Sequence, residues 1–263
     1  MSADPARTSG ALSTYDVIGT RVGAVTMEAL VMRVRGWLGD GRPHYVCFAD
    51  VNSLIQGRDN PEMRAALDDA DVVSPDGKPL AVVGQMLRGA AVSKTSGPDF
   101  LEVFCARTAG MGVRHFFLGG MGGVAQTLAT QLSVRYPGLD VAGTYSPPRY
   151  PFTTPQNDEM LTAIRAARPD VVWVGLGAPR QEIWMRQNAP LLPGVTLFGV
   201  GAAFDFSAGL VQRAPLWMQK AGLEWAYRVS QEPGRLFRRY ATNVPRFLGL
   251  LMLDALRSRV QGS

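Results

Sequence analysis

The chain has 263 residues, of which 46% are hydrophobic and 19% are charged, so a folded protein with a sizeable core is expected and a disordered chain is excluded. The first fifteen residues are polar and contain no apolar stretch after a basic start, which predicts the absence of a signal peptide. No apolar run approaches the roughly 18 residues needed to cross a bilayer. Cys47 and Cys105 lack metal-like spacing and are expected to be buried free thiols in a reducing cytosol.

Short β-rich runs alternate along the chain with segments of helical period, a rhythm typical of a mainly parallel sheet with helices on both faces. The expected strands are 45–48, 71–74, 113–118, 139–142, 171–174 and 195–200. The expected helices are 60–67, 124–136, 155–167 and 179–188. Strand patterns stop after Gly209. The sequence therefore predicts a Rossmann-like α/β domain over residues 1–212 and a basic helical appendage over residues 213–263.

Asp76 follows one of the expected strands and stands between Pro75 and Gly77. The backbone should turn sharply there and leave the carboxylate at the carboxyl edge of the sheet. In a partly apolar pocket the pKa of this carboxyl would rise, which suits a general base. From spacing alone, a Pro-Asp-Gly turn whose aspartate only caps its own backbone is the favoured alternative.

A glycine-rich loop begins at Gly119 and Gly120, between an expected strand and an expected helix. This is the placement that a phosphate-binding glycine turn requires. A dinucleotide site would also need an acid at the end of the next strand, whereas Asp140 lies at the beginning of that strand. An NAD-binding oxidoreductase is therefore the poorer interpretation.

A second loop, with Gly177 and Pro179, lies where a buried strand leads into a helix. Ligands of α/β sheets bind at such turns. Gln181 and Glu182 would then occupy the first helical turn, where backbone N–H groups are free and a side-chain amide can contact a polar ligand. An ordinary strand-to-helix loop is the alternative for this segment taken alone.

The net charge of +5 comes from the last fifth of the chain, where nine Lys or Arg stand against three Asp or Glu from Arg213 onward. Aromatic residues are interleaved with these charges, which favours an anionic and apolar partner such as a membrane surface. Residues 247–256 are apolar except for Asp254 and are typical of an amphipathic surface helix. Nucleic acid is the competing partner, but the rest of the chain adds no basic surface.

A series of motifs between about residues 45 and 240 resembles the WecG/TagA/CpsF family of bacterial glycosyltransferases in order and spacing. The motifs are Pro75-Asp-Gly77, Ser96-Gly-Pro-Asp99, Phe117-Leu-Gly-Gly120, Tyr136-Pro-Gly138, Gly175-Leu-Gly-Ala-Pro-Arg-Gln-Glu182, Gly201-Ala-Ala-Phe-Asp205, Arg213-Ala-Pro215, Gly222-Leu-Glu-Trp-Ala-Tyr-Arg228 and Glu232-Pro-Gly-Arg235. The resemblance implies a cytosolic enzyme, peripherally associated with the inner membrane. Such an enzyme transfers a sugar from a UDP-sugar to a polyprenyl-diphosphate-linked acceptor, with inversion and without a required metal or other cofactor.

The resemblance also implies roles for individual residues. Asp76 takes the role of the base that deprotonates the acceptor hydroxyl. Asn52 corresponds to a nucleotide or sugar contact, and Gly97, Asp99 and Asp205 lie in motifs expected to bind substrate.

Three arginines of the basic segment resemble those that close over the leaving UDP in this family. Arg228, Arg235 and Arg238 are seven and three residues apart, so on one helix they would share a face and could clamp a diphosphate. Pro233 interrupts a single continuous helix, but as the first residue of a new helix it would leave Arg235 and Arg238 adjacent. A solvated basic face that only touches anionic lipid is the alternative.

The chain departs from the family pattern at Asp50-Val-Asn52, where many members have Thr-x-Asn. Asp50 is expected to contact substrate, and it could mark a different donor sugar or share the base role. Asp69-Ala-Asp71 formally matches the Asp-x-Asp of metal-dependent glycosyltransferases, but we interpret it as a helix end and a strand start, without metal. The donor sugar, the acceptor glycan and a homo-oligomeric state are left open, with an exopolysaccharide or capsule repeat unit as the preferred product.

Overall fold

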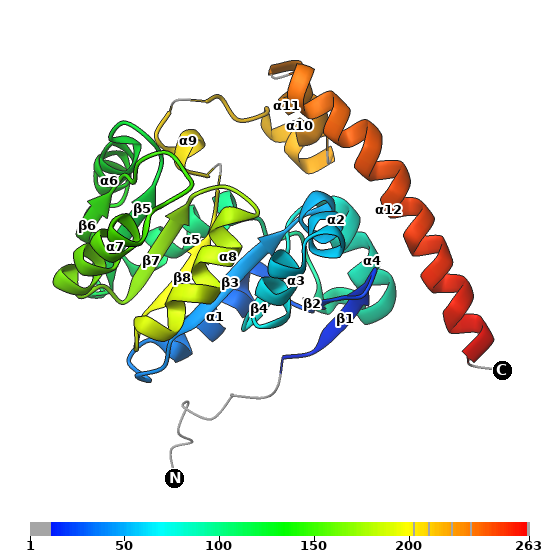
Figure 1. The fold of residues 1–263 in the computed structure, drawn as a ribbon, viewed down its shortest axis with the longest axis horizontal. Coiled ribbons are helices and arrows are strands. Elements are labelled where there is room, and N and C mark those ends of the chain that lie inside the picture. Colours follow the sequence, from blue (N-terminus) through cyan, green and yellow to red (C-terminus); the bar gives the residue numbers. More distant parts are fainter. Residues whose placement is uncertain (1–11, 202, 210, 222, 232, 262–263) are drawn as a thin grey trace, which may run out of the picture.

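The structure is a computed structural model that describes residues 12–201, 203–209, 211–221, 223–231 and 233–261. Its centre is a six-stranded, fully parallel sheet in the order β4-β3-β8-β7-β5-β6 (Figure 1). The strands are β3 His44–Ala49, β4 Val72–Pro75, β5 Arg114–Gly119, β6 Asp140–Tyr145, β7 Val171–Gly175 and β8 Thr196–Gly199. All six expected strands are present, and the Rossmann-like α/β prediction is confirmed.

Helices cover both faces of this sheet, because alternate residues of each strand point into two separate cores. One core packs the strands against α2 Val51–Asp59, α3 Pro61–Asp68, α4 Lys78–Arg88, α7 Thr154–Ala167 and α8 Arg180–Asn188. The other packs them against α1 Met27–Trp37, α5 Gly97–Thr108, α6 Val124–Arg135 and α9 Ala203–Ser207. Two short 3-10 turns, Gly89–Ala91 and Ala189–Leu191, extend α4 and α8.

Helix ends follow the local sequence signals. Asn60 accepts a hydrogen bond from Glu62 N at 2.9 Å, and Pro61 is the first residue of α3. Thr153 and Gln156 form a reciprocal capping box at the start of α7. These hydrogen bonds fix the residues at which α3 and α7 begin.

A small antiparallel hairpin, β1 Thr14–Val17 and β2 Thr20–Gly23, was not predicted. It packs on α4 through Tyr15, whose hydroxyl donates to Leu80 O at 3.1 Å. A Cβ on Gly84 would lie 2.6 Å from the Tyr15 ring, so this close approach requires glycine.

The core holds both cysteines and a histidine. Cys47 and Cys105 are buried free thiols, as predicted. His115 lies between Trp173 Nε1, 3.1 Å from His115 Nδ1, and Thr108 Oγ1, 3.0 Å from His115 Nε2. Burial lowers the pKa of His115 to about 3, so the ring is neutral in the folded protein.

The helical segment after β8 consists of α10 Leu216–Ala221, α11 Glu224–Gln231 and α12 Pro233–Gln261. Pro233 begins a new helix, as predicted. In Figure 1, α12 runs beside α2, and an ion pair joins Arg246 to Asp59 at 2.5 Å. Phe247 is buried in the core beneath α12, so this helix packs on the sheet domain. Within the described residues, no helix is long and apolar enough to span a membrane.

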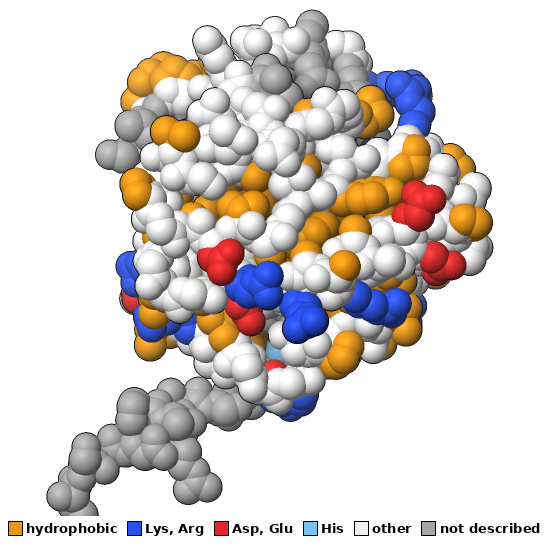
Figure 2. Space-filling model, turned by 90° about the vertical axis from the view of Figure 1, so that its left-hand side faces the viewer, with side chains coloured by type: hydrophobic (Ala, Val, Ile, Leu, Met, Phe, Trp, Pro, Cys, Tyr) orange, Lys and Arg blue, Asp and Glu red, His pale blue; other side chains and the backbone are white. Residues whose placement is uncertain are grey.

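Figure 2 looks onto the side of the molecule that carries β6 and α7 in Figure 1. Hydrophobic side chains form a band across the middle of this face, with Lys and Arg side chains grouped below it. Strand β6, which begins with exposed Asp140 and ends with Tyr145, is the edge strand here. The next strand after the glycine-rich loop thus has no acid at its end, which disfavours a dinucleotide site.

Candidate active site

All six strands of the parallel sheet end at one edge, and a cavity of about 1230 Å³ opens there. Residues that follow every strand line it. They are Asp50 after β3, Asp76 after β4, Gly120 after β5, Pro147 after β6, Gly177 after β7 and Gly201 after β8. The predicted loops therefore converge on one cavity at the carboxyl edge, where α/β sheets bind ligands.

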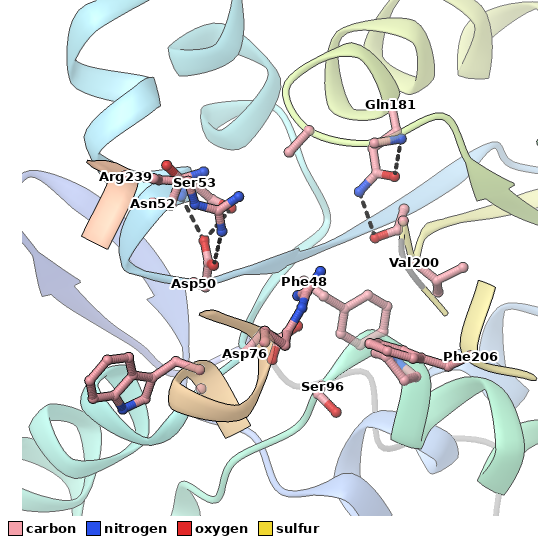
Figure 3. Close-up of a pocket in the computed structure, with 18 of the residues that line it drawn as sticks. Phe48, Asp50, Asn52, Ser53, Asp76, Ser96, Gln181, Val200, Phe206 and Arg239 are labelled. Carbon is pink, nitrogen blue, oxygen red and sulfur yellow. Dashed lines mark hydrogen bonds and ion pairs between the residues drawn. The ribbon is translucent and has the colours of Figure 1, made fainter. Parts of the chain in front are cut away.

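Asp76 lies at the floor of this cavity, immediately after β4, where its backbone N–H donates to Ala49 O at 2.9 Å (Figure 3). The residue is half-buried, and its carboxylate accepts no hydrogen bond from any described residue. Burial and then repulsion from Asp50 outweigh the attraction of Lys94 and raise the pKa of Asp76 to about 7. A carboxyl with this pKa exchanges its proton near neutral pH, as a general base must.

Asp50, on the neighbouring strand end, is held by partners. Its Oδ1 accepts from Ser53 N at 2.8 Å and from Ser53 Oγ at 3.0 Å, which caps α2. Its Oδ2 lies 3.4 Å from the guanidinium of Arg239 on α12 (Figure 3). The contrast between a partnered Asp50 and an unpartnered Asp76 favours Asp76 as the base.

Asn52 is buried in the first turn of α2 and lines the cavity. Its Oδ1 accepts a hydrogen bond from Asn243 of α12 at 2.8 Å. Asn52 thus faces both the cavity and the C-terminal helix.

Gln181 and Glu182 are buried in the first turn of α8, as predicted, and line the cavity. Gln181 Oε1 accepts from Gly177 N at 3.2 Å, while its Nε2 donates to Gly199 O at 3.0 Å and to Glu182 Oε1 at 2.8 Å (Figure 3). The amide oxygen thus holds the β7 loop, while the two amide hydrogens bind the end of β8 and the neighbouring Glu182.

Burial raises the pKa of Glu182 to about 7, and its Oε2 has no hydrogen-bond partner among the described residues. Glu182 orients the Gln181 amide, which in turn fixes the loop that holds Gly177. This supporting role was not predicted from the sequence.

The predicted glycines have two roles. Gly120 and Gly177, with φ of 61° and 76°, line the cavity. Gly97 and Gly119 lie behind it. A Cβ on Gly97 would be 3.1 Å from Val200 Cα, and one on Gly119 would be 2.5 Å from Gly175 O, so both glycines allow close packing beneath the cavity.

Asp99 belongs to an ion-pair network that joins the sheet domain to the appendage. Arg213 NH1 donates to Asp99 Oδ1 at 2.7 Å, and Arg213 Nε donates to Glu224 Oε1 at 3.0 Å. Lys94 Nζ lies 3.0 Å from Glu224 Oε2. Although burial opposes it, the Arg213 guanidinium and the Ser96 hydroxyl hold the pKa of Asp99 below its usual value. Asp99 therefore contacts Arg213 where a direct substrate contact was expected.

The arginines of the appendage are placed differently from one another. Arg228 lines the cavity and lies over the Phe206 ring, with 5.5 Å from its guanidinium carbon to the ring centroid. Arg238 is exposed and is not part of the cavity lining, whereas the next residue, Arg239, lines the cavity. The side chains of Asp205 and Arg235, which were also expected to bind substrate, lie outside the described part of the chain.

The Asp-x-Asp pair lies at the opposite, amino-terminal edge of the sheet. Asp69 pairs with Arg186 at 2.6 Å, and Asp71 accepts from His44 Nδ1 and Tyr45 N at 2.9 Å each. Both residues follow α3 and precede β4, as predicted. Among the described residues, no group of three or more His, Cys, Asp or Glu is placed to hold a metal ion.

The family assignment rests on nearly the whole chain. The sequence model of the glycosyl transferase WecG/TagA/CpsF family matches residues 15–261. The chain belongs to this family. The match adds the β1–β2 hairpin and most of α12, which lie before and after the motifs at about residues 45–240. Both of these segments pack on the sheet domain described above. Membership makes the protein a glycosyltransferase.

Proposed function

We propose that this glycosyltransferase transfers a sugar from a UDP-sugar to a hydroxyl of a polyprenyl-diphosphate-linked saccharide, with inversion at the anomeric carbon. The observation that carries the proposal is the unpartnered, half-buried Asp76 carboxyl at the cavity floor, with its pKa raised to about 7. Around it the cavity presents cationic side chains that suit phosphorylated substrates, among them Arg228 and Arg239.

This arrangement supports the following reaction. Asp76 accepts the proton of the acceptor hydroxyl as its oxygen forms a bond to the anomeric carbon. The bond from that carbon to the β-phosphate oxygen breaks, and UDP leaves with the electron pair. Arg228 and other cations of the cavity stabilise the negative charge that develops on the departing phosphate.

Membrane association is the second part of the proposal, because the acceptor is anchored by a lipid. On α12, Leu248, Met252 and Leu256 recur every four residues and are each more than half exposed, while Phe247 packs inward. We call these three residues the apolar stripe. With the excess positive charge of the segment from residue 213 onward, the stripe would hold the enzyme at the inner face of an anionic cytoplasmic membrane.

The test is incubation of the purified protein with a panel of UDP-sugars and membrane-extracted lipid acceptors, followed by mass spectrometry of the lipid product. Release of UDP together with a product one sugar heavier is expected. Glucose, N-acetylmannosamine and its uronic acid are the donors to compare, with acceptors from exopolysaccharide or capsule synthesis. Transfer from another nucleotide sugar, or to a soluble acceptor alone, would contradict the proposal.

A further inference from the structure

The connections of the sheet reverse direction between β5 and β7. Strand β5 leads through α6 to β6 on one side, and β7 leads through α8 to β8 on the other. The two helices also pack in different cores, on opposite faces of the sheet. A crevice therefore opens between the ends of β5 and β7, and such topological switch points bind ligands in open α/β sheets.

Two arginines lie at this end of the cavity. Arg149 is in the loop after β6, beside β5, and Arg180 is the first residue of α8, after β7. The Arg180 guanidinium lies over the Tyr150 ring at 5.5 Å, and its NH2 is 3.5 Å from the position of a Cβ on Gly177. Arg180 thus extends across the Gly177 turn.

These two guanidinium groups are available to a ligand. Both residues are exposed, and neither pairs with a carboxylate in the part of the chain that the structure describes. By contrast, Lys94, Arg213 and Arg239 each have a carboxylate partner. Paired guanidinium groups beside glycine turns suit a diphosphate, which accepts several charge-assisted hydrogen bonds.

The geometry of an inverting reaction points to the donor as the source of that diphosphate. The acceptor oxygen lies within about 3 Å of the base, and the anomeric carbon about 3 Å beyond it, with the leaving phosphate on the far side. Asp76 follows β4, and β7 is three strands away in the sheet, or about 14 Å. A donor that lies on the β7 side of Asp76 would direct its leaving diphosphate toward the crevice, where Arg149 and Arg180 line the cavity. Arg239, bound to Asp50 on the strand next to β4, lies on the base side.

We propose that Arg149 and Arg180 form the subsite for the diphosphate of the nucleotide-sugar donor, at the β5–β7 crevice. This assignment rests on the proposed function, because it takes the donor to be a nucleotide diphosphate sugar.

Calorimetric titration of the full chain with uridine and UDP tests the subsite. Arg149→Ala and Arg180→Ala should each weaken UDP binding about tenfold to a hundredfold, while leaving uridine affinity unchanged. Arg35→Ala, which removes an exposed arginine outside the cavity lining, is the matched control and should bind both ligands as the wild type does. Both arginines are exposed, so melting temperatures should match the wild type.

Farnesyl diphosphate is a soluble prenyl diphosphate. It distinguishes a subsite for the donor diphosphate from a subsite for the diphosphate of the lipid-linked acceptor. The two variants should bind it with wild-type affinity, and equal losses for UDP and farnesyl diphosphate would overturn the assignment to the donor. If the wild type binds UDP and both variants do so equally well, the subsite is refuted while the proposed function stands. If the wild type does not bind UDP, the proposed donor and the subsite fail together.

Discussion

The pKa of Asp76 leads to a prediction about the rate of sugar transfer. With a pKa of about 7, about half of the Asp76 carboxyls are ionised at pH 7 and about one tenth at pH 6. Because only the ionised form accepts the proton, kcat/KM should fall about tenfold for each pH unit below 7 and level off above about pH 8. Asp76→Asn should lower turnover by about two to four orders of magnitude and leave UDP binding nearly intact.

Asp50→Asn is the matched variant, because Asp50 repels the Asp76 carboxylate. Removing that charge should lower the pKa of Asp76, so the acidic limb of the pH profile should move to lower pH. The assay is single-turnover transfer between pH 5 and 9, followed by mass spectrometry of the product. Wild-type turnover in Asp76→Asn would refute the assignment, and an active Asp76→Asn beside an inactive Asp50→Asn would identify Asp50 as the base.

The free energy of unfolding should also depend on the raised pKa of Asp76. Burial raises the pKa of Asp76 above its ordinary value of 3.8, so the folded state favours the protonated acid. The stability from this group is fully present below about pH 4 and is lost as the pH rises through about 7. Asp76→Asn should therefore melt at a higher temperature than the wild type at pH 8, and an unchanged or lower melting temperature would contradict the raised pKa.

Three further outcomes are expected. Transfer should continue in EDTA, because we propose that cationic side chains stabilise the leaving group in place of a metal, and an absolute need for Mn²⁺ or Mg²⁺ would contradict this. The double variant Leu248→Asp and Met252→Asp should sediment less with anionic liposomes, since it removes most of the apolar stripe but keeps Phe247. Val134→Asp, at another exposed apolar position, is its control and should sediment as the wild type does. His115 should destabilise the fold on acidification, because its pKa is lowered to about 3 and stability is lost as the pH falls from 6.5 toward that value. Urea denaturation at pH 7, 5 and 4 should show a loss on the order of a few kcal/mol that is smaller in His115→Gln.

The strands were predictable because each central one is buried on both faces. Segments such as 171–174 are continuous apolar runs bounded by loop residues, a pattern typical of the central strands of a parallel sheet. The order of the strands in the sheet could not be predicted from the same apolar runs, since it depends on which helices cover which face of the sheet. The β5–β7 crevice, and with it the placement of Arg149 and Arg180, follows only from that order.

The site was predictable where one residue stands at a strand end and not where two distant segments meet. Asp76 and Gly177 are marked by their own neighbours in the sequence. The bond between Asp50 and Arg239 joins residues 189 positions apart, and the one between Asn52 and Asn243 joins residues 191 positions apart. Helical spacing placed Arg228, Arg235 and Arg238 on one face, but the contact with α2 decides which face of α12 turns toward the cavity. That contact brings Arg239 to Asp50.

The sequence predicts a boundary near residue 212, but residues from both sides of it line the cavity. Lys94 and Asp99 of the sheet domain bind Glu224 and Arg213 of the appendage, and three of these four residues change the pKa of Asp76. Lys94 lowers that pKa, while Glu224 and Asp99 raise it. Because Glu224 partly neutralises Lys94, the appendage weakens a cation that would otherwise favour the ionised base. The proton affinity of Asp76 is thus set jointly by the sheet edge and by the helices that cover it.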